Sequence, residues 1–211
     1  PALEVITFIN RLEASRGARR LAVYDYEDGA YRLLWEHIGA DRAADRVRID
    51  APGSVGNFDG AGPLEIVVAR YLAADRRWTT TVHDAVSGAV RATLPERTSL
   101  AGVADLDGDD VPEILGYLGG ELVAHRFTGE AVSVLWRLED RRVVRVSDGP
   151  RPRLPNPSRI FTMQLDDDAP PELVLGERAS DGRLVALHAY DADGESPSLI
   201  GSFRAPEGVR I

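Results

Sequence analysis

Three short acidic segments of the chain could each hold a metal ion. They span residues 57–65, 105–113 and 164–172, and an apolar run typical of a β-strand follows each one directly. Read as nine positions, each segment offers side-chain oxygens at positions 1, 3, 5 and 9, with one alanine as the exception. The residues at these positions are Asn57, Asp59, Ala61 and Glu65 in the first segment, Asp105, Asp107, Asp109 and Glu113 in the second, and Gln164, Asp166, Asp168 and Glu172 in the third.

Alternate oxygens on a tight loop suit calcium, which takes six to eight oxygen ligands in irregular geometry. Magnesium is smaller and gives up its water reluctantly, so it fits such a loop less well. A backbone carbonyl at position 7 is the natural additional ligand, and it would come from Pro63, Val111 or Pro170. The motif is not an EF-hand, because Asp110 and Gly116 stand where an EF-hand needs glycine and glutamate.

Position 2 of each segment is apolar, which predicts that the loop anchors its other side in the core. The residues there are Phe58, Leu106 and Leu165. Acidic turns between strands also form without a metal, because Asp and Gly tolerate the backbone angles of tight turns. Three segments in register favour a repeat with a built-in cation site. We expect calcium first in 105–113, then in 164–172, and last in 57–65, which hydrogen bonds alone could hold.

The spacing of acidic residues before an apolar strand resembles the FG-GAP/VCBS repeat, the blade unit of integrin-α-like β-propellers. The match is close for residues 102–117, good for 161–176 and partial for 55–70. The resemblance implies blades of four antiparallel strands around a central axis, with calcium in a loop between strands of one blade. It implies Asp105, Asp107, Asp109 and Glu113 as side-chain ligands and Val111 as a carbonyl ligand. The chain departs from the family pattern at Gln164, Asn57 and Ala61.

The rest of the sequence repeats with the acidic segments. Short alternating runs end in polar turns with Gly29, Gly88, Gly129 or Gly194, and a further alternating run follows each turn, which is typical of hairpins. The chain therefore predicts an all-β propeller array of four units, at about 1–48, 49–97, 98–156 and 157–211. Four blades could close into a small propeller, or they could form a segment of a larger one. The Pro- and Arg-rich stretch 141–157 is either a solvated connector or a loop that binds a partner.

Histidines and tryptophans recur at corresponding points of these units. His83, His125 and His188 stand just before the hairpin turn, where the first unit has Tyr24. A repeated aromatic residue at one position favours blade packing or a cross-strand pair. A metal or catalytic site built from three separate units is the alternative interpretation. Trp35 and Trp136 also correspond, and both are expected in the core.

Composition narrows the function classes. The 211 residues carry a net charge of −9, all 25 basic residues are arginine, and there is no cysteine. The acidic balance argues against a nucleic-acid partner, which would need a basic surface. No signal peptide and no run long enough to span a membrane is present in the sequence. A calcium-dependent module would work best where calcium is abundant, so we expect an extracellular, periplasmic or cell-surface location.

Two functions are compatible with these observations. The favoured hypothesis is a non-enzymatic interaction and adhesion module, in which structural calcium stiffens blades that present loops to a protein or a glycan. The alternative is the propeller domain of a secreted polysaccharide-processing enzyme such as a lyase. No phosphate-binding loop, nucleophile elbow or zinc-protease motif is present, and no catalytic residue is predicted. Fold class alone does not choose a ligand.

Overall fold

The computed structural model describes residues 5–9, 20–38, 46–48, 54–72, 75–95, 97–143, 160–167, 170–179, 181 and 183–206. Within these ranges the chain forms β-strands and turns and no helix. This confirms the all-β class. No helix in the same ranges has the length and apolar character that would let it cross a bilayer.

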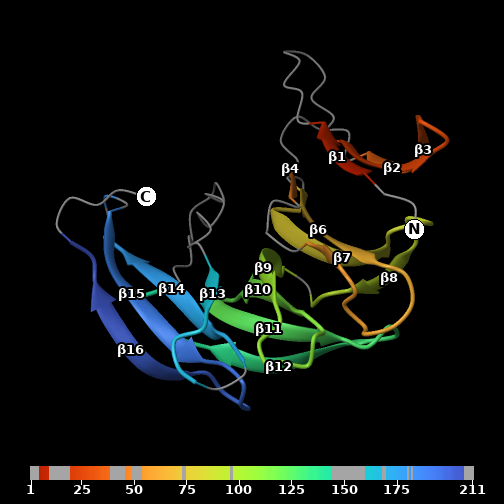
Figure 1. Ribbon diagram of the computed structural model, residues 1–211. Coiled ribbons are helices and arrows are strands. Elements are labelled where there is room, and N and C mark those ends of the chain that lie inside the picture. The colour runs from red at the N-terminus through yellow and green to blue at the C-terminus, as the bar shows by residue number, and fades with distance from the viewer. Residues whose placement is uncertain are drawn as a thin grey trace. The chain divides into compact units, whose positions relative to one another are not determined.

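The strands form four antiparallel sheets that follow one another along the chain (Figure 1). The first sheet has the order β1-β2-β3, with β1 Val5–Ile9, β2 Arg20–Glu27 and β3 Ala30–Ile38. The second has the order β4-β6-β7-β8 with β5 beside β6, and its bounds are β4 Arg46–Arg48, β5 Val55–Gly56, β6 Glu65–Leu72, β7 Arg77–Asp84 and β8 Val90–Thr93.

The third and fourth sheets each contain four strands in sequential order. The third consists of β9 Ser99–Ala104, β10 Glu113–Leu118, β11 Glu121–Phe127 and β12 Val132–Leu138. The fourth consists of β13 Phe161–Met163, β14 Glu172–Arg178, β15 Leu184–Asp191 and β16 Ser198–Arg204. Four strands per sheet is therefore the observed pattern in these two sheets.

The second sheet differs from the expected blade at one edge. β6 is eight residues long, and two short strands share the edge beside it: β5 pairs at Glu65 and Ile66, and β4 pairs from Ala69 to Tyr71. β4 lies just before the boundary near residue 48 that the sequence suggests, yet it pairs with the second sheet. The first sheet has three strands among the described residues, one fewer than the predicted blade.

The hairpins lie where the glycine-containing turns predict them. Turns at Gly29, Gly88, Gly129 and Gly194 join β2 to β3, β7 to β8, β11 to β12 and β15 to β16, respectively. In the first of these, Asp28 and Gly29 both have positive φ, 53° and 82°. Two successive left-handed residues give the type I′ turn, whose twist matches that of paired strands. This turn needs glycine or a residue such as Asp that tolerates the left-handed region.

The chain divides into two compact units. Unit 1 contains residues 1–100 and 128–132, and unit 2 contains residues 101–127 and 133–211. In unit 1, the first and second sheets share a small core of Leu21, Val23, Ile66, Val68 and Ala85. Trp35 packs against this core and donates its indole N–H to the carbonyl of Ala85 at 2.9 Å.

Unit 2 has the larger core, formed between the third and fourth sheets, which lie side by side in Figure 1. The third sheet contributes Leu115, Leu122 and Trp136, and the fourth contributes Leu173 and Tyr190, all of them 2 % exposed or less. Trp136 is thus a core residue as predicted, and Trp35 lies at the core's margin. Pairwise packing of sheets is the expected way for successive sheets to bury their apolar faces.

Candidate cation-binding loops

The three acidic segments occupy the same place in three sheets. Each segment connects two neighbouring strands of its sheet. Residues 57–64 connect β5 to β6, residues 105–112 connect β9 to β10, and residues 164–171 connect β13 to β14. In the first sheet β2 carries the glycine-containing hairpin, so β1 corresponds to β6, β10 and β14, and no counterpart of the acidic loop occurs among the described residues of that sheet. The three segments are therefore structural counterparts as well as sequence repeats.

The glutamate at position 9 closes each loop onto its own start. One oxygen of Glu65 accepts the backbone N–H of Phe58 at 2.9 Å, and Glu113 accepts that of Leu106 at 2.9 Å. Glu172 accepts the backbone N–H of Leu165 at 2.6 Å. The three glutamates are 0–2 % exposed. A buried carboxylate on a backbone N–H is a strong, charge-assisted hydrogen bond, so this glutamate is a structural tie in every loop.

The apolar residue at position 2 is buried in two loops out of three. Phe58 and Leu106 are fully buried, as the sequence predicts. Leu165 is 42 % exposed, so the prediction is wrong for the third loop. The hydrogen bond to Glu172 keeps its backbone in the same pattern, but the side chain does not reach a core.

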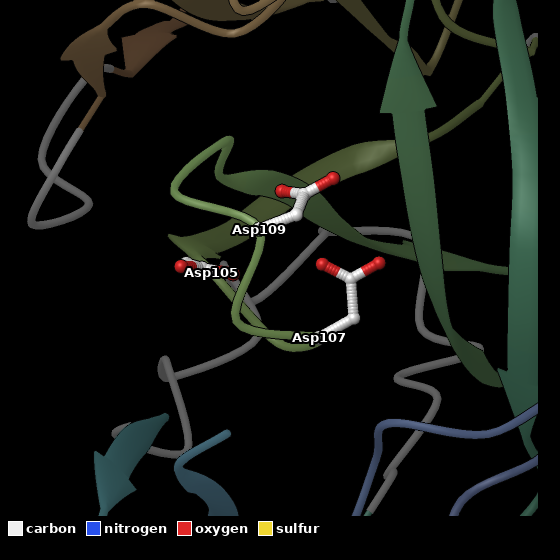
Figure 2. A group of neighbouring side chains, drawn as sticks. All are labelled: Asp105, Asp107 and Asp109. Atoms are coloured by element: carbon white, nitrogen blue, oxygen red, sulfur yellow. The ribbon is translucent and has the colours of Figure 1, made fainter. Parts of the chain in front are cut away.

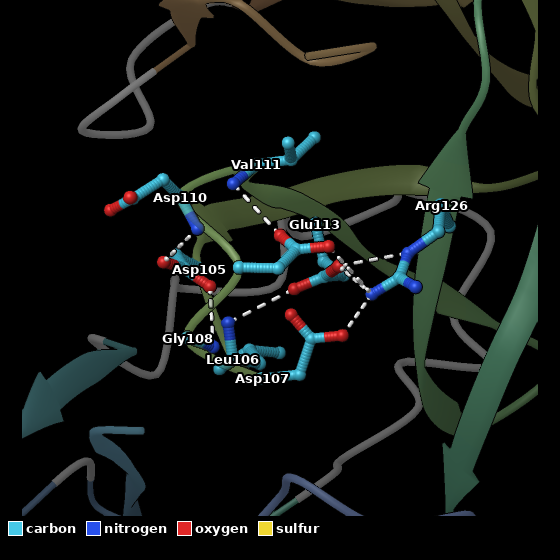
Figure 3. A network of polar contacts seen from close by, with 9 residues as sticks. Asp105, Leu106, Asp107, Gly108, Asp110, Val111, Glu113 and Arg126 are labelled. Carbon is cyan, nitrogen blue, oxygen red and sulfur yellow. Dashed lines mark hydrogen bonds and ion pairs between the residues drawn. The ribbon is translucent and has the colours of Figure 1, made fainter. Parts of the chain in front are cut away.

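An arginine bridges positions 3 and 9 in the first two loops. In the loop 105–113, Arg126 of β11 contacts Asp107 and binds Glu113 at 2.8 Å (Figure 3). In the loop 57–65, Arg91 of β8 contacts Glu65 and binds Asp59 at 2.9 Å. The two arginines come from different strands of their sheets, yet each places a guanidinium between the same two carboxylates.

The loop 105–113 is the only one of the three whose described residues bring three carboxylates together at metal-binding range. Ligand atoms of Asp105, Asp107 and Asp109 lie within 4.8 Å of one another (Figure 2). Backbone donors hold the loop in shape: Asp105 accepts the N–H of Gly108 at 2.8 Å and that of Asp110 at 3.0 Å. Asp109 accepts the N–H of Val111 at 2.9 Å.

Backbone angles and one unpartnered oxygen fit a cation in this loop. Gly108 and Asp110 have φ of 74° and 64°, the left-handed region that such a turn requires. One Asp107 oxygen contacts Arg126, whereas its Oδ1 is buried and has no hydrogen-bond partner among the described residues. A buried, unsatisfied carboxylate oxygen is costly unless something binds it. The donor set consists of hard oxygens, which suits calcium or magnesium rather than a softer metal.

Hydrogen bonds and an arginine hold the loop 57–65. Asp59 accepts the N–H of Ala61 at 2.9 Å and is 7 % exposed at its side chain. Ala61 supplies no oxygen at position 5. Asn57 Oδ1 is buried and has no partner among the described residues. Pro63 belongs to the exposed part of the loop.

The third loop is only partly described. Gln164 donates its amide to the carbonyl of Asp166 at 3.1 Å, so its side chain turns toward its own loop. Asp168, a predicted ligand, lies outside the described residues. A Cβ placed on Gly108 would lie 3.6 Å from the Pro170 ring, which shows that the second and third loops adjoin within unit 2. The ligand roles predicted for Gln164, Asp166, Asp168, Pro170 and Glu172 stay predictions, as do the carbonyl roles of Val111 and Pro63.

Burial dominates the electrostatics of the loop glutamates. Desolvation raises the pKa of Glu113 above its usual value, although its hydrogen bond from Arg126 and the N–H of Leu106 oppose the shift. The pKa of Glu65 is raised for the same main reason. The pKa of the Arg126 guanidinium is raised as well, by its hydrogen bonds to Glu113 and Asp107, so Arg126 stays charged beside them. The Arg126 guanidinium thus lowers the cost of burying the Glu113 carboxylate.

The sequence interpretation missed both arginines. The register of β10 and β11 could have predicted Arg126. It pairs Ile114 with His125, so Arg126, the next residue along β11, lies opposite Glu113. The same register in the second sheet puts Asp84 opposite Glu65, and Arg91 reaches the site from β8 instead. Strand register could therefore have found one arginine but not the other.

The histidines correspond less closely than their spacing suggests. His83 faces Ile66 and His125 faces Ile114, each next to the loop glutamate. In the fourth sheet the residue facing Leu173 is Tyr190, and His188 lies two residues earlier, facing Leu175. All three histidines are buried, at 0–3 % exposure. The expectation of packing holds, and the expectation of one equivalent position holds only for His83 and His125.

Comparison with known proteins gives weak structural likeness only. No family model matches the chain, and no curated protein matches it. The exotype rhamnogalacturonan lyase YesX aligns with a TM-score of 0.45 and 17 % identity over 90 % of this chain and 42 % of its own. A rhamnogalacturonan lyase of Bacillus licheniformis, PL11, aligns with a TM-score of 0.45 and 18 % identity over 96 % of this chain and 48 % of its own. The chain spans less than half of either structure, and similarity at this level carries no argument about activity.

Proposed function

We propose that the chain is a calcium-stabilised β-propeller module of the FG-GAP/VCBS kind, whose sheets present loops to a protein or glycan partner outside the cell or at its surface. The observation that carries the proposal is the group of Asp105, Asp107 and Asp109, whose ligand atoms lie within 4.8 Å of one another. The preference for calcium over magnesium rests on the many protein oxygens and the irregular loop geometry.

The charge balance of the loop supports a bound cation. The loop contains five carboxylates, and three of them, those of Asp107, Asp109 and Glu113, pair with the Arg126 guanidinium. Carboxylates this close repel one another unless a cation compensates them. Asp105, Asp107 and Asp109 would hold the ion with their side chains, and Val111 with its carbonyl. A bound calcium would neutralise the surplus charge and fix the loop between β9 and β10.

The role proposed for the ion is structural. The glutamate and the loop aspartates already accept backbone N–H groups or bind Arg126, so they hold the loop's shape rather than await a substrate. An ion that binds the folded chain and not the unfolded chain stabilises it by mass action. A rigid scaffold with exposed loops is in turn the usual carrier of a binding surface.

Thermal unfolding of the full chain tests this proposal. A chelator should lower the melting temperature at low ionic strength, and added calcium should restore it, while the same concentration of magnesium should restore less. Equal melting curves with chelator and with calcium would contradict a structural ion. If the module binds a partner through calcium-stabilised loops, the chain should be retained on an array of glycans or on a protein ligand only when calcium is present. Retention that is equal with and without calcium would mean that the chain binds a partner but does not need the ion to do so.

The alternative is a domain of a secreted polysaccharide-processing enzyme such as a lyase, the class named by the two similar structures. Their TM-scores give it no weight beyond that of a class to test. Incubation with acidic polysaccharides, followed by ultraviolet absorbance of an unsaturated product, decides it. Absorbance that grows with time would replace the interaction module by an enzyme.

A further inference from the structure

A cleft of about 570 Å³ opens in unit 2, on the fourth sheet. It lies toward the ends of β14 and β16 and the start of β15, whereas the acidic loop of that sheet precedes β14 at the other end. Its walls include apolar side chains, among them Leu184, Val185 and Pro206. Concave sites with apolar walls and a few converging polar groups are the usual form of ligand sites.

The floor of the cleft holds a fixed histidine. His188 is 3 % exposed, and both of its ring nitrogens have partners. Its Nδ1 lies 2.9 Å from Ser202 Oγ, and its Nε2 lies 2.9 Å from a Glu177 carboxylate oxygen. These three side chains come from β15, β16 and β14, and they lock one another in place. A polar floor whose rotamers are already fixed loses little freedom when a ligand binds.

Three arginines from separate segments meet at the cleft: Arg142 from the turn after β12, Arg183 before β15, and Arg204 at the end of β16. Asp140 holds the Arg142 guanidinium through Nε at 3.0 Å, and Tyr190 holds Asp140 at 2.7 Å. Asp181 holds Arg183 through Nε at 2.6 Å. Each carboxylate uses only part of its arginine's five donors, so further N–H groups remain for a ligand.

Arg204 is the most available of the three. Its side chain makes no ion pair or hydrogen bond within the part of the chain that the structure describes, and the residue lies opposite Ala186 in the register of β15 and β16. It therefore shares a sheet face with His188 and Ser202, since alternate residues of a strand point the same way. An unpaired arginine beside two oriented ones is an arrangement that recognises an oxyanion.

We propose that this cleft binds the oxyanion of a small or saccharide ligand, a carboxylate or a sulfate, with Arg204 as the principal contact and Arg183 and Arg142 as oriented donors. The apolar wall would pack against the ligand's carbon skeleton, and Ser202 and His188 would line its base. Asp140 and Asp181 pair with two of the three arginines, so Arg204 supplies the unpaired positive charge of the cleft. The inference goes beyond the cation loop and does not depend on calcium.

Titration calorimetry and amide chemical-shift mapping of the full chain test it, with sulfate, acetate and glucuronate as three separate probes in the presence of a chelator. We expect at least one probe to bind, with shifts at residues 184–188 and 202–206, and the probe that binds identifies the oxyanion. Arg204→Gln should weaken that binding about tenfold or more, the loss typical of a charge-assisted hydrogen bond. Arg32→Gln is the matched control, because Arg32 is an exposed arginine of unit 1 that should not matter.

Two results would overturn the proposal: no shift at the cleft with any of the three probes, or equal affinity of Arg204→Gln and the parent chain. If Arg204→Gln melts at a lower temperature than the parent, Arg183→Gln replaces it, because Arg183 pairs with the exposed Asp181 of its own turn and its loss should disturb the fold little. Binding in chelator separates this site from the proposed calcium loop, so either proposal can fail while the other stands.

Discussion

The loops 57–65 and 105–113 are closed by the same two interactions, but they differ in how many carboxylates they carry. In both, the position 9 glutamate accepts the N–H of position 2, and an arginine bridges positions 3 and 9. The loop 57–65 then has two carboxylates, Asp59 and Glu65, against Arg91. The loop 105–113 has five carboxylates, of which those of Asp107, Asp109 and Glu113 pair with Arg126.

This difference separates two tasks that the sequence motif merges. The glutamate tie and the arginine bridge close a loop without any metal, and they occur in both sheets. The aspartates at positions 1 and 5 are not required for the glutamate tie, because the loop 57–65 has Asn57 and Ala61 in their places. In the loop 105–113, Asp105 and Asp109 accept further backbone N–H groups and also add the negative charge that a cation would neutralise.

The closure should be the most sensitive part of both loops. Glu113→Ala and Glu65→Ala each leave a backbone N–H and an arginine without their buried carboxylate, so each should lower the free energy of unfolding by about 3 kcal/mol. Urea denaturation measures the loss. Glu121→Ala is the control, because Glu121 forms an exposed pair with Arg137 and should cost less than about 1 kcal/mol. If Glu65→Ala matches Glu121→Ala while Glu113→Ala does not, the two loops do not share a closure.

Calcium should act on one loop only. At a concentration about 100 times its dissociation constant, calcium should add about 2.7 kcal/mol to stability and raise the melting temperature by about 5–10 °C. Asp107→Asn should abolish this increment, whereas Asp59→Asn should keep it, since the loop 57–65 lacks an oxygen at position 5. Scanning calorimetry with and without calcium measures the increment for each variant against its own baseline. Loss of the increment in both variants would mean that the loops are alike after all.

The arginines should sharpen the comparison further. Arg126→Gln and Arg91→Gln each remove the bridge between positions 3 and 9, and each should cost about 1–2 kcal/mol in the presence of chelator. Calcium should compensate for the loss in Arg126→Gln, because removing the guanidinium leaves a more negative oxygen cluster. It should not compensate in Arg91→Gln. Denaturation curves of the two variants with chelator and with calcium give the four values needed.

Much of this could be predicted from the sequence, and particular residues show where the limit lies. The acidic loops, the hairpin turns at Gly29 and Gly129, and the all-β class follow from local chemistry, which acts over a few residues. The bridge by Arg91 could not be foreseen, because its strand reaches the loop by a path that register does not encode. The pairing of β4 with β6 depends on the length of β5, which pairs with only two residues of β6 and leaves the rest of that edge available. Exposure of Leu165 likewise depends on the packing around its sheet and not on its position in the motif.

The smallest expected effect concerns the histidines beside the two loops. Burial lowers the pKa of His125 to about 4, and neither ring nitrogen has a partner among the described residues. Burial also lowers the pKa of His83, which binds Thr81 Oγ at 2.8 Å and Gly88 O at 3.1 Å. A folded pKa below the unfolded value of about 6.5 means that stability present at neutral pH is lost as the pH falls from about 6.5 toward the folded pKa.

The free energy of unfolding should therefore fall by about 1 kcal/mol less in His125→Leu than in the parent when the pH is lowered from 7 to 5.5. At pH 7 the substitution should cost little stability, since it breaks no hydrogen bond. His83→Leu should cost stability already at pH 7, because it leaves Thr81 and Gly88 without their partner. The raised pKa values of Glu65 and Glu113 act with the opposite sign, adding stability as the pH falls toward about 4.5. Since both glutamates are present in the two histidine variants and in the parent, the difference between each of these variants and the parent isolates the histidine. Urea denaturation at the two pH values measures it, and an unchanged acid loss in His125→Leu would show that His125 does not stay neutral in the folded chain.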